Sequence, residues 1–296
     1  VSNAGALGSL PCATLGPDAM DRELAALAAG TQRPYNVNFF CHAQPEADEA
    51  REAAWRAWLT TYYHEAGLDI DTVPAGAGRV PFNRAALDIL ERFRPKVVSF
   101  HFGLPDLDLL DRVKGWGAVV LSSATTVEEA RWLEAFGVDA VIAQGVEAGG
   151  HRGTFLGDFQ SSLVGTLALV PQCVDALDIP VIAAGGIMDG RAIAGALALG
   201  AEAVQMGTAF LTCPESAIGP AYRQALTQAG PTDTRTTRIF SGRPARGIVN
   251  TMMDALRADE RSVPPYPVQN ALTGALRRAA AQAGRADHLS LWAGQG

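Results

Sequence analysis

Two patterns of apolar residues alternate along most of the chain. Short runs of small and β-branched apolar residues are followed by longer stretches in which apolar residues recur every three or four positions. The short runs are typical of buried parallel strands, and the longer stretches of amphipathic helices that cover such a sheet. The expected strands are 97–102, 117–122, 139–144, 180–184 and 203–207, and the expected helices are 105–114, 126–136, 161–177 and 189–199. This alternation predicts an α/β protein built on a parallel sheet.

The first forty residues add two more strands to this sheet. Residues 6–10 and 34–40 have strand character, and a helix is expected between them at 17–30. Asn36 and Asn38 fall on the same side of the second strand, because side chains alternate along a strand. The count is then seven strands, and the fold that best matches the spacing, the (β/α)8 TIM barrel, needs eight. We therefore expect a TIM barrel that lacks its first strand, and its final helix, within this sequence.

Two segments depart from the alternation. Residues 44–94 contain a helix rich in alanine and tryptophan, a loop of glycine and proline at 73–81 and a further helix from Asn83, which predicts an inserted helical segment or lid. Residues 232–270 have no strong period and precede a helix expected at 271–283, so we expect them to pack across the barrel mouth. Because α/β barrels reach about 250 residues as one unit, residues 1–296 are expected to form a single domain.

Composition excludes several classes of protein. The hydrophobic fraction of 48% and the charged fraction of 19% are ordinary for a soluble protein, and no run of 18 apolar residues could span a membrane. A formal charge of -7 with scattered basic residues argues against binding to nucleic acid. The four cysteines lie far apart with no metal-ligand spacing, which indicates reduced thiols in a cytoplasmic protein without a metal site. Neither lysine follows a strand, so Schiff-base chemistry is disfavoured.

Three expected strands run directly into glycine-rich turns. They are QGVEAGGHRG at 144–153, PVIAAGGI at 180–187 and AVQMGT at 203–208. Ligands of α/β proteins bind at the carboxyl ends of the strands, and in a completed barrel the last two turns would follow strands seven and eight, which often hold a phosphate. No Walker loop or GxGxxG pattern is present. The candidates for holding a phosphate-bearing cofactor are Gly185, Gly186, Gly207 and Thr208.

His151 is the titratable residue of the first turn. Its glycine neighbours leave it uncrowded, and an ordinary pKa near 6.5 suits acid, base or hydrogen-bond chemistry. We expect the other four histidines to be structural or solvated, and Glu147 to cap or anchor the backbone without a chemical role. Two further groups of candidates are expected to have structural roles. We expect the arginines of the segment 235–246 to form salt bridges, and the tyrosines to be packing residues. These residues are Arg235, Arg238, Arg243 and Arg246, and Tyr62, Tyr63 and Tyr266.

Together the segments QGVEAGGHRG, AAGGIMDGR, QMGTAFL, FSGRPARGIVN and LWAGQG closely resemble the class I nitronate monooxygenases, formerly called 2-nitropropane dioxygenases. The resemblance implies an FMN-dependent TIM-barrel oxidoreductase that uses molecular oxygen to convert alkyl nitronates, such as propionate 3-nitronate, into a carbonyl compound and nitrite. It implies that His151 is the catalytic residue. The positions that it implies for FMN are Asn38, Gln144, Gly149, Gly150, Gly185, Gly186, Gln205, Met206, Gly207 and Thr208.

Two alternatives stay open. The EAGGH turn also resembles the FMN-containing enoyl-ACP reductases, which draw hydride from NAD(P)H, and a flavin-binding barrel without turnover is a third possibility. The arginine segment and residues 44–94 favour the monooxygenase.

Overall fold

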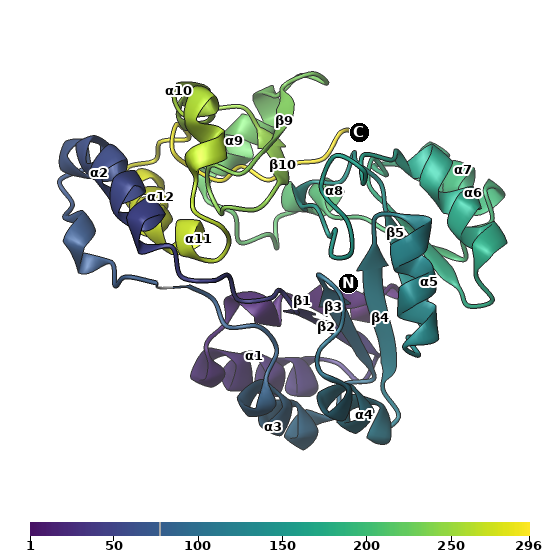
Figure 1. Ribbon diagram of the computed structural model, residues 1–296. Helices are drawn as coiled ribbons and strands as arrows, with labels where there is room; N and C mark the ends of the chain where they lie inside the picture. The colour runs from purple at the N-terminus through teal and green to yellow at the C-terminus, as the bar shows by residue number, and fades with distance from the viewer. Residues whose placement is uncertain (77) are drawn as a thin grey trace.

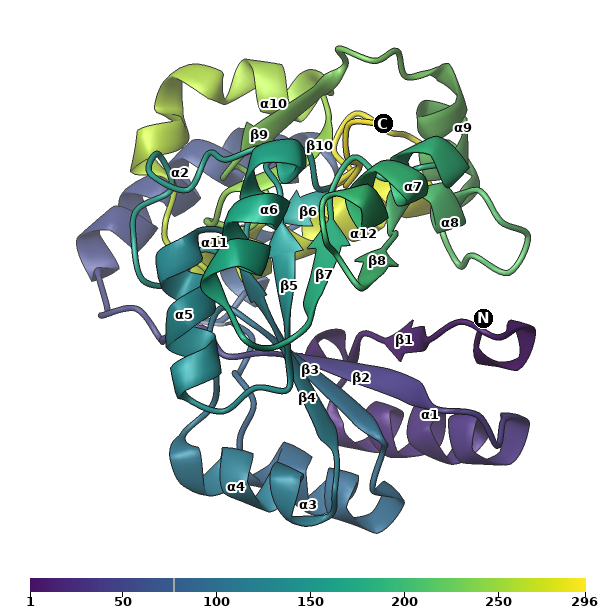
Figure 2. The ribbon, with the colours of Figure 1, turned by 90° about the vertical axis from the view of Figure 1, so that its right-hand side faces the viewer.

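The computed structural model describes residues 1–76 and 78–296, and its centre is a seven-stranded parallel sheet curled into a half-barrel (Figures 1 and 2). The strands follow one another in chain order, and each pairs in parallel with its neighbours. They are β1 (Gly8–Leu10), β2 (Tyr35–Phe40), β3 (Val97–His101), β4 (Val119–Ala124), β5 (Ala140–Gln144), β7 (Val181–Ala184) and β8 (Ala203–Gln205). The expected barrel-type parallel sheet is confirmed.

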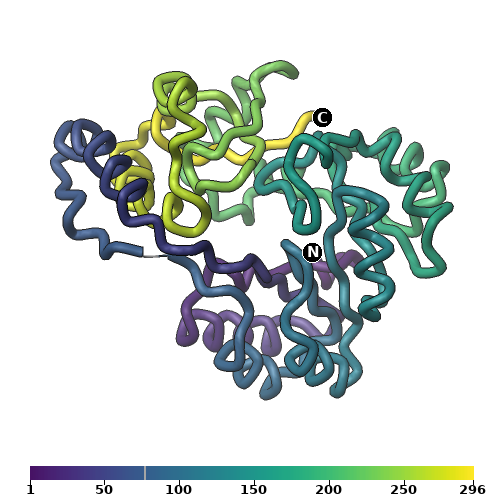
Figure 3. The backbone as a smooth tube through the Cα atoms, viewed as in Figure 1, coloured from purple at the N-terminus to yellow at the C-terminus, as the bar shows by residue number. Residues whose placement is uncertain are grey.

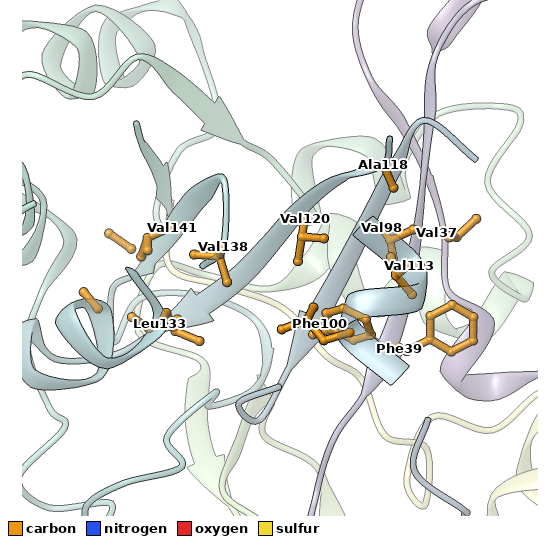
Figure 4. Close-up of a cluster of buried hydrophobic side chains, with 14 of the residues drawn as sticks. Val37, Phe39, Val98, Phe100, Val113, Ala118, Val120, Leu133, Val138 and Val141 are labelled. Atoms are coloured by element: carbon orange, nitrogen blue, oxygen red, sulfur yellow. The ribbon is translucent and has the colours of Figure 1, made fainter. Parts of the chain in front are cut away.

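Six helices cover the outer face of this sheet (Figure 2). The buried side chains between helices and strands form the main hydrophobic core, in which Phe100 and Leu133 are fully buried (Figure 4), as is Leu87 of α3. Burying a side chain of this size contributes about 1.5–3 kcal/mol. The helices are α1 (Pro17–Gly30), α3 (Arg84–Phe93), α4 (Leu107–Gly115), α5 (Val127–Ala135), α6 (Thr166–Ala176) and α7 (Gly190–Ala198).

Two elements begin later than predicted, one by two residues and the other by five. The strand expected at 117–122 begins only at Val119, because Gly117 has a φ of 83° and belongs to a turn. The helix expected at 161–177 begins at Thr166, because the backbone before it turns, with Ser162 N donating to Phe159 O.

A small antiparallel sheet that was not predicted lies beyond the carboxyl ends of β5 and β7 (Figure 2). It consists of β6 (Gly150–His151), β10 (Ala245–Ile248) and β9 (Thr234–Thr237), in that order. TRTT and ARGI are too short and too polar to give a strand signal. Around it lie α8 (Thr208–Leu211), α9 (Pro220–Gln228), α10 (Thr251–Ala255), α11 (Val268–Leu272) and α12 (Gly274–Gln282). Elsewhere along the chain, 3-10 turns occur at Ser2–Ala4, Cys12–Thr14, Ile70–Thr72 and Arg257–Ser262.

The structure divides the segment expected as an insertion, 44–94, into two parts. Helix α3 belongs to the sheet's outer cover, beside α1 and α4. Helix α2 (Glu49–Glu65) instead lies on the side of the molecule where α10 to α12 are found (Figures 1 and 3). Its Trp55, Leu59 and Tyr63 form a second hydrophobic cluster with residues of those helices. In the predicted loop 73–81, Ala77 lies outside the described residues. The helix expected at 271–283 is two helices that meet at Thr273.

No helix in the described part of the chain is long and apolar enough to cross a membrane.

Candidate active site

The three glycine-rich junctions lie side by side at one edge of the sheet. Gln144 on β5 is in register with Ala184 on β7, and Ala184 with Gln205 on β8. The residues that follow these three positions therefore begin their turns next to one another. Gly185 and Gly186 have φ values of 109° and 69°, a conformation that strains any residue with a Cβ. The structure thus brings together the turns that the sequence singled out.

The segment Leu291–Gly296, LWAGQG, crosses all three junctions. Gln295 N donates to the Glu147 carbonyl at 2.8 Å, and Gly294 N to Thr208 Oγ1 at 3.0 Å. A Cβ on Gly186 would lie 3.0 Å from the Gln295 carbonyl, and one on Gly149 would lie 2.6 Å from Gly294 N. The sequence identified this segment by resemblance alone, and the structure shows that it closes one side of the site.

Glu147 anchors the first junction to helix α6, in keeping with the structural role expected for it. Its carboxylate accepts hydrogen bonds from Thr166 N at 2.9 Å and from Thr166 Oγ1 at 2.9 Å. The acid thus satisfies a backbone donor at the helix start, where the helix dipole also favours a negative charge.

Replacing Glu147 by alanine is expected to lower the free energy of unfolding by about 1–3 kcal/mol, because a half-buried backbone N–H loses its charged acceptor. The urea midpoint measures this loss. Glu128→Ala, at an exposed position in the first turn of α5, is the matched control and should change little. Equal midpoints for the two variants would contradict the anchoring role.

His151 is held by its own backbone and by a serine. Its strand β6 pairs with β10, with His151 opposite Ala245, and its Nε2 lies 2.9 Å from Ser241 Oγ. Ser241 Oγ in turn lies 3.1 Å from the Arg243 carbonyl, which accepts the hydroxyl proton. The hydroxyl then accepts from His151 Nε2, and this arrangement leaves His151 Nδ1 free to accept a proton.

The His151 carbonyl is held by side chains of the parallel sheet. Gln144 Nε2 donates to it at 3.0 Å, and His101 Nε2 lies 3.2 Å away. Gln144 Oε1 accepts from Gly153 N at 2.8 Å. Both ends of the Gln144 amide therefore hold the loop that carries His151.

Aromatic rings surround the His151 imidazole. The centroids of Phe40, Phe102, Tyr266 and Trp292 lie 5.6–6.1 Å from its own. The Arg243 guanidinium stacks on Phe102, with 3.8 Å between its carbon and the ring centroid. The site therefore combines an aromatic wall with the positive charge of Arg243.

The pKa of His151 is lowered to about 3, mostly by burial and in smaller part by nearby charged groups such as the Arg243 guanidinium. The pKa of His101 is lowered to about 4, again mostly by burial, with the charge of Arg243 as the next cause. Both imidazoles are neutral at pH 7, so His151 is a neutral hydrogen-bond partner at that pH and only a weak base.

These lowered pKa values predict that acid destabilises the fold. An unfolded histidine takes up a proton near pH 6.5, whereas the folded His101 does so only near pH 4, so stability is complete above about 6.5 and falls as the pH drops below it. Urea midpoints at pH 7.5 and 5.5 would measure the fall, and His101→Gln should make it smaller. A fall of the same size in the variant would show that His101 does not cause it.

Several residues of this site were not chosen from the sequence. His42, His101 and Tyr266 lie in its wall, and the Tyr266 ring is 4.7 Å from that of His42. His101 ends strand β3, and this position at a strand's carboxyl end was a signal that could have found it. Within the described residues, Arg235 is the only one of the four arginines of 235–246 that forms an ion pair, and its partner is Asp254. Arg246 instead donates to the Val146 carbonyl, and Arg243 to the Thr154 carbonyl.

The remaining predicted cofactor positions differ in their surroundings. Asn38 is half-buried, and its Oδ1 accepts from Ser99 Oγ at 2.8 Å. Gln205 and Gly207 are exposed, Met206 is half-buried, and a Cβ on Gly207 or Gly150 would meet nothing within 4 Å. No group of three or more potential metal ligands occurs in residues 1–76 and 78–296.

The matching family model and two similar proteins name one family. The family model described as nitronate monooxygenase matches residues 1–296. The chain is 45% identical over 306 residues to a nitronate monooxygenase of Pseudomonas aeruginosa, covering 100% of this chain and 85% of that protein. It is 42% identical over 301 residues to the nitronate monooxygenase of Paraburkholderia phytofirmans, covering 81% of it.

Two solved structures are also similar. One is the nitroalkane oxidase from Streptomyces ansochromogenes, with a TM-score of 0.89, 42% identity and coverage of 100% of this chain and 84% of that one. The other is FabK from Thermotoga maritima, with a TM-score of 0.73, 30% identity and coverage of 100% and 79%.

Proposed function

Because this chain belongs to the nitronate monooxygenase family, we propose that it oxidises small alkyl nitronates with molecular oxygen to a carbonyl compound and nitrite, with FMN as its cofactor. The observation that carries the proposal is the register of β5, β7 and β8, which sets the three glycine-rich turns beside one another and next to His151. The chain is thus an oxidoreductase that acts on a small molecule.

The residues at these turns fit the two ends of FMN. At the ends of β7 and β8, Gly185 and Gly186 and the open space at Gly207 let backbone N–H groups approach phosphate oxygens. The end of β5 and the turn after it, with Gln144, Gly149 and Gly150, are left for the flavin ring. Gln205, Met206 and Thr208 lie at the end of β8 and in the segment after it and thus belong to the phosphate end, and Asn38 on β2 is the remaining predicted contact. When bound, FMN would supply the one-electron redox chemistry between the nitronate and molecular oxygen.

The protein's own residues then do three things. The aromatic wall around His151 excludes water from the reacting carbon. The Arg243 guanidinium and backbone N–H donors stabilise the negative charge of the nitronate. The neutral His151 orients the substrate and can take a proton at Nδ1, because its Nε2 is engaged by Ser241.

We further propose that residues 1–296 form one FMN-binding domain of a cytoplasmic protein, with the α2 region of 44–94 acting as a lid and 232–270 packing over the barrel mouth. The pairing of β10 with the strand that carries His151 supports the packing of 232–270 over the barrel mouth. All four cysteines are free thiols, as a reducing compartment requires.

Oxygen uptake with propionate 3-nitronate, measured with and without NADH, tests the activity. The proposal expects a yellow protein that consumes oxygen with the nitronate alone. The similarity to FabK favours a second candidate, an FMN enoyl reductase. Rapid NADH oxidation coupled to an enoyl thioester, without nitronate-dependent oxygen uptake, would establish that candidate instead, and a protein that binds no flavin would exclude both.

A further inference from the structure

A cavity of about 280 Å³ lies between the loop that follows β2, the loop that follows β6 and the turn between β9 and β10, and the proposed chemistry assigns no role to it. Three arginines line it, the buried Arg152, the half-buried Arg243 and the exposed Arg238. Thr154 and Tyr266 are the other lining side chains that carry hydrogen-bonding groups. None of the described residues that line the cavity is acidic, so its wall is strongly basic.

The three guanidinium groups of the cavity are charged and have no acidic partner. Across residues 1–76 and 78–296, no acidic side chain forms an ion pair with any of them. Arg152 donates to the carbonyls of Gln144 and Ser162, and its buried Nε has no hydrogen-bond partner among the described residues. Burial lowers the pKa of Arg152 and of Arg243 to about 10, so both are charged at neutral pH. Buried charge without a counter-ion is unfavourable, and an anion in the cavity would offset it.

Two nearby carboxylates offset only part of this charge. Glu129 is buried and accepts hydrogen bonds from three backbone N–H groups and one hydroxyl, and Glu260 accepts from the backbone N–H of Arg238. Neither carboxylate lines the cavity. Because Arg152 Nη1 and Nη2 and Arg243 Nη2 already donate to carbonyls, few N–H groups remain for a ligand. The cavity therefore suits a small anion with two oxygens better than phosphate, whose four oxygens need more donors.

The cavity shares two residues with the wall around His151. The Tyr266 ring lies 5.6 Å from the His151 ring, and the Arg243 guanidinium lies on Phe102, whose ring is 5.9 Å from that of His151. Tyr266 is buried, and its hydroxyl has no hydrogen-bond partner within the described residues. An oxyanion bound beside Tyr266 would supply the missing acceptor. A small oxyanion formed at His151 thus arises next to this cavity.

We propose that this cavity binds a small oxyanion with one negative charge, and that its occupant is the nitrite that the proposed reaction releases. The inference rests on the proposed function, which forms nitrite at His151 and uses Arg243 to stabilise the nitronate. A guanidinium presents paired N–H donors that match the two oxygens of nitrite. Because nitrite and nitronate would both use Arg243, the product competes with the substrate, and the enzyme slows as nitrite accumulates.

The test measures nitrite as an inhibitor of oxygen uptake with propionate 3-nitronate. We expect nitrite to raise the apparent KM and to leave kcat unchanged. Arg238→Met should raise the inhibition constant of nitrite about two- to fivefold, because Arg238 is exposed and solvent screens part of its charge. Arg238→Glu should raise this constant further, and Arg238→Lys should keep it within about twofold of the wild type. Arg131→Met, at an exposed position on α5, is the control for loss of an arginine and should leave the constant unchanged.

A binding measurement separates this inference from the activity itself. Calorimetric titration of the flavin-loaded protein should show that nitrite binds more tightly than inorganic phosphate, and that Arg238→Met and Arg238→Glu bind nitrite more weakly than the wild type. Nitrite that lowers kcat without raising KM, equal binding of nitrite to the wild type and Arg238→Glu, or tighter binding of phosphate would overturn the assignment. A wild type that releases no nitrite from a nitronate would instead refute the proposed function, and the titration would still test the cavity.

Discussion

Replacing His151 by alanine is expected to remove most turnover and to leave flavin bound. The imidazole packs against four aromatic rings and offers a free Nδ1, so its loss removes the residue that orients the nitronate and can take a proton. A positioned acid or base is worth about 10²–10⁴-fold in rate, and kcat/KM with propionate 3-nitronate should fall within that range. Oxygen uptake measures the rate, and flavin absorbance after gel filtration measures cofactor retention.

The matched control is His64→Ala, which makes the same side-chain change at an exposed position on α2. It should keep wild-type turnover. If His151→Ala also keeps wild-type turnover, the role assigned to His151 is wrong. If it loses flavin together with activity, His151 is a cofactor-binding residue instead.

Gly149→Ala is the second change with a large expected effect. The new Cβ would lie 2.6 Å from Gly294 N and 2.7 Å from the carbonyl carbon of Ala293, and backbone atoms cannot rotate away as a side chain can. The crossing segment must shift, so we expect the free energy of unfolding to fall by about 1–3 kcal/mol and flavin retention to fall with it. The urea midpoint and the flavin-to-protein absorbance ratio report the two losses.

Gly115→Ala serves as the comparison, since a Cβ there meets nothing within 4 Å. It should retain both the midpoint and the flavin. Unchanged values for Gly149→Ala would mean that the crossing segment is not packed on this loop in solution.

The parallel sheet could be predicted from the sequence because its strands carry their signal locally. Val97, Val98 and Phe100 are buried on β3, and such continuous apolar runs occur in strands covered on both faces. The small sheet could not be predicted, because TRTT and ARGI become strands only through pairing with each other and with Gly150–His151. Their stability comes from distant partners, which a local pattern does not contain.

The candidate site also has one part that could be predicted from the sequence and one part that could not. The carboxyl ends of neighbouring parallel strands lie at the same edge of the sheet, so the glycine-rich turns could be predicted to be neighbours. The register of β5, β7 and β8 confirms this. The wall around His151 joins Phe40, Phe102, Tyr266 and Trp292, which come from separate parts of the chain and bear no common motif. The pKa of His151 depends on that wall, so it could not be read from the turn alone.

The pairing of His151 with Ala245 joins the proposed catalytic residue to β10, whose Ile248 packs with Leu291 and Ala293 in a cluster separate from the core of the parallel sheet. Proteins open in cooperative units of unequal stability, and a short two-residue strand held at the edge of such a unit is a weak point. A sub-global opening that frees β10 would disorder His151 while amides of β3 to β5 stay protected from exchange. If His151 has the proposed role, heating is expected to abolish turnover before the amides of β3 to β5 lose their protection from exchange.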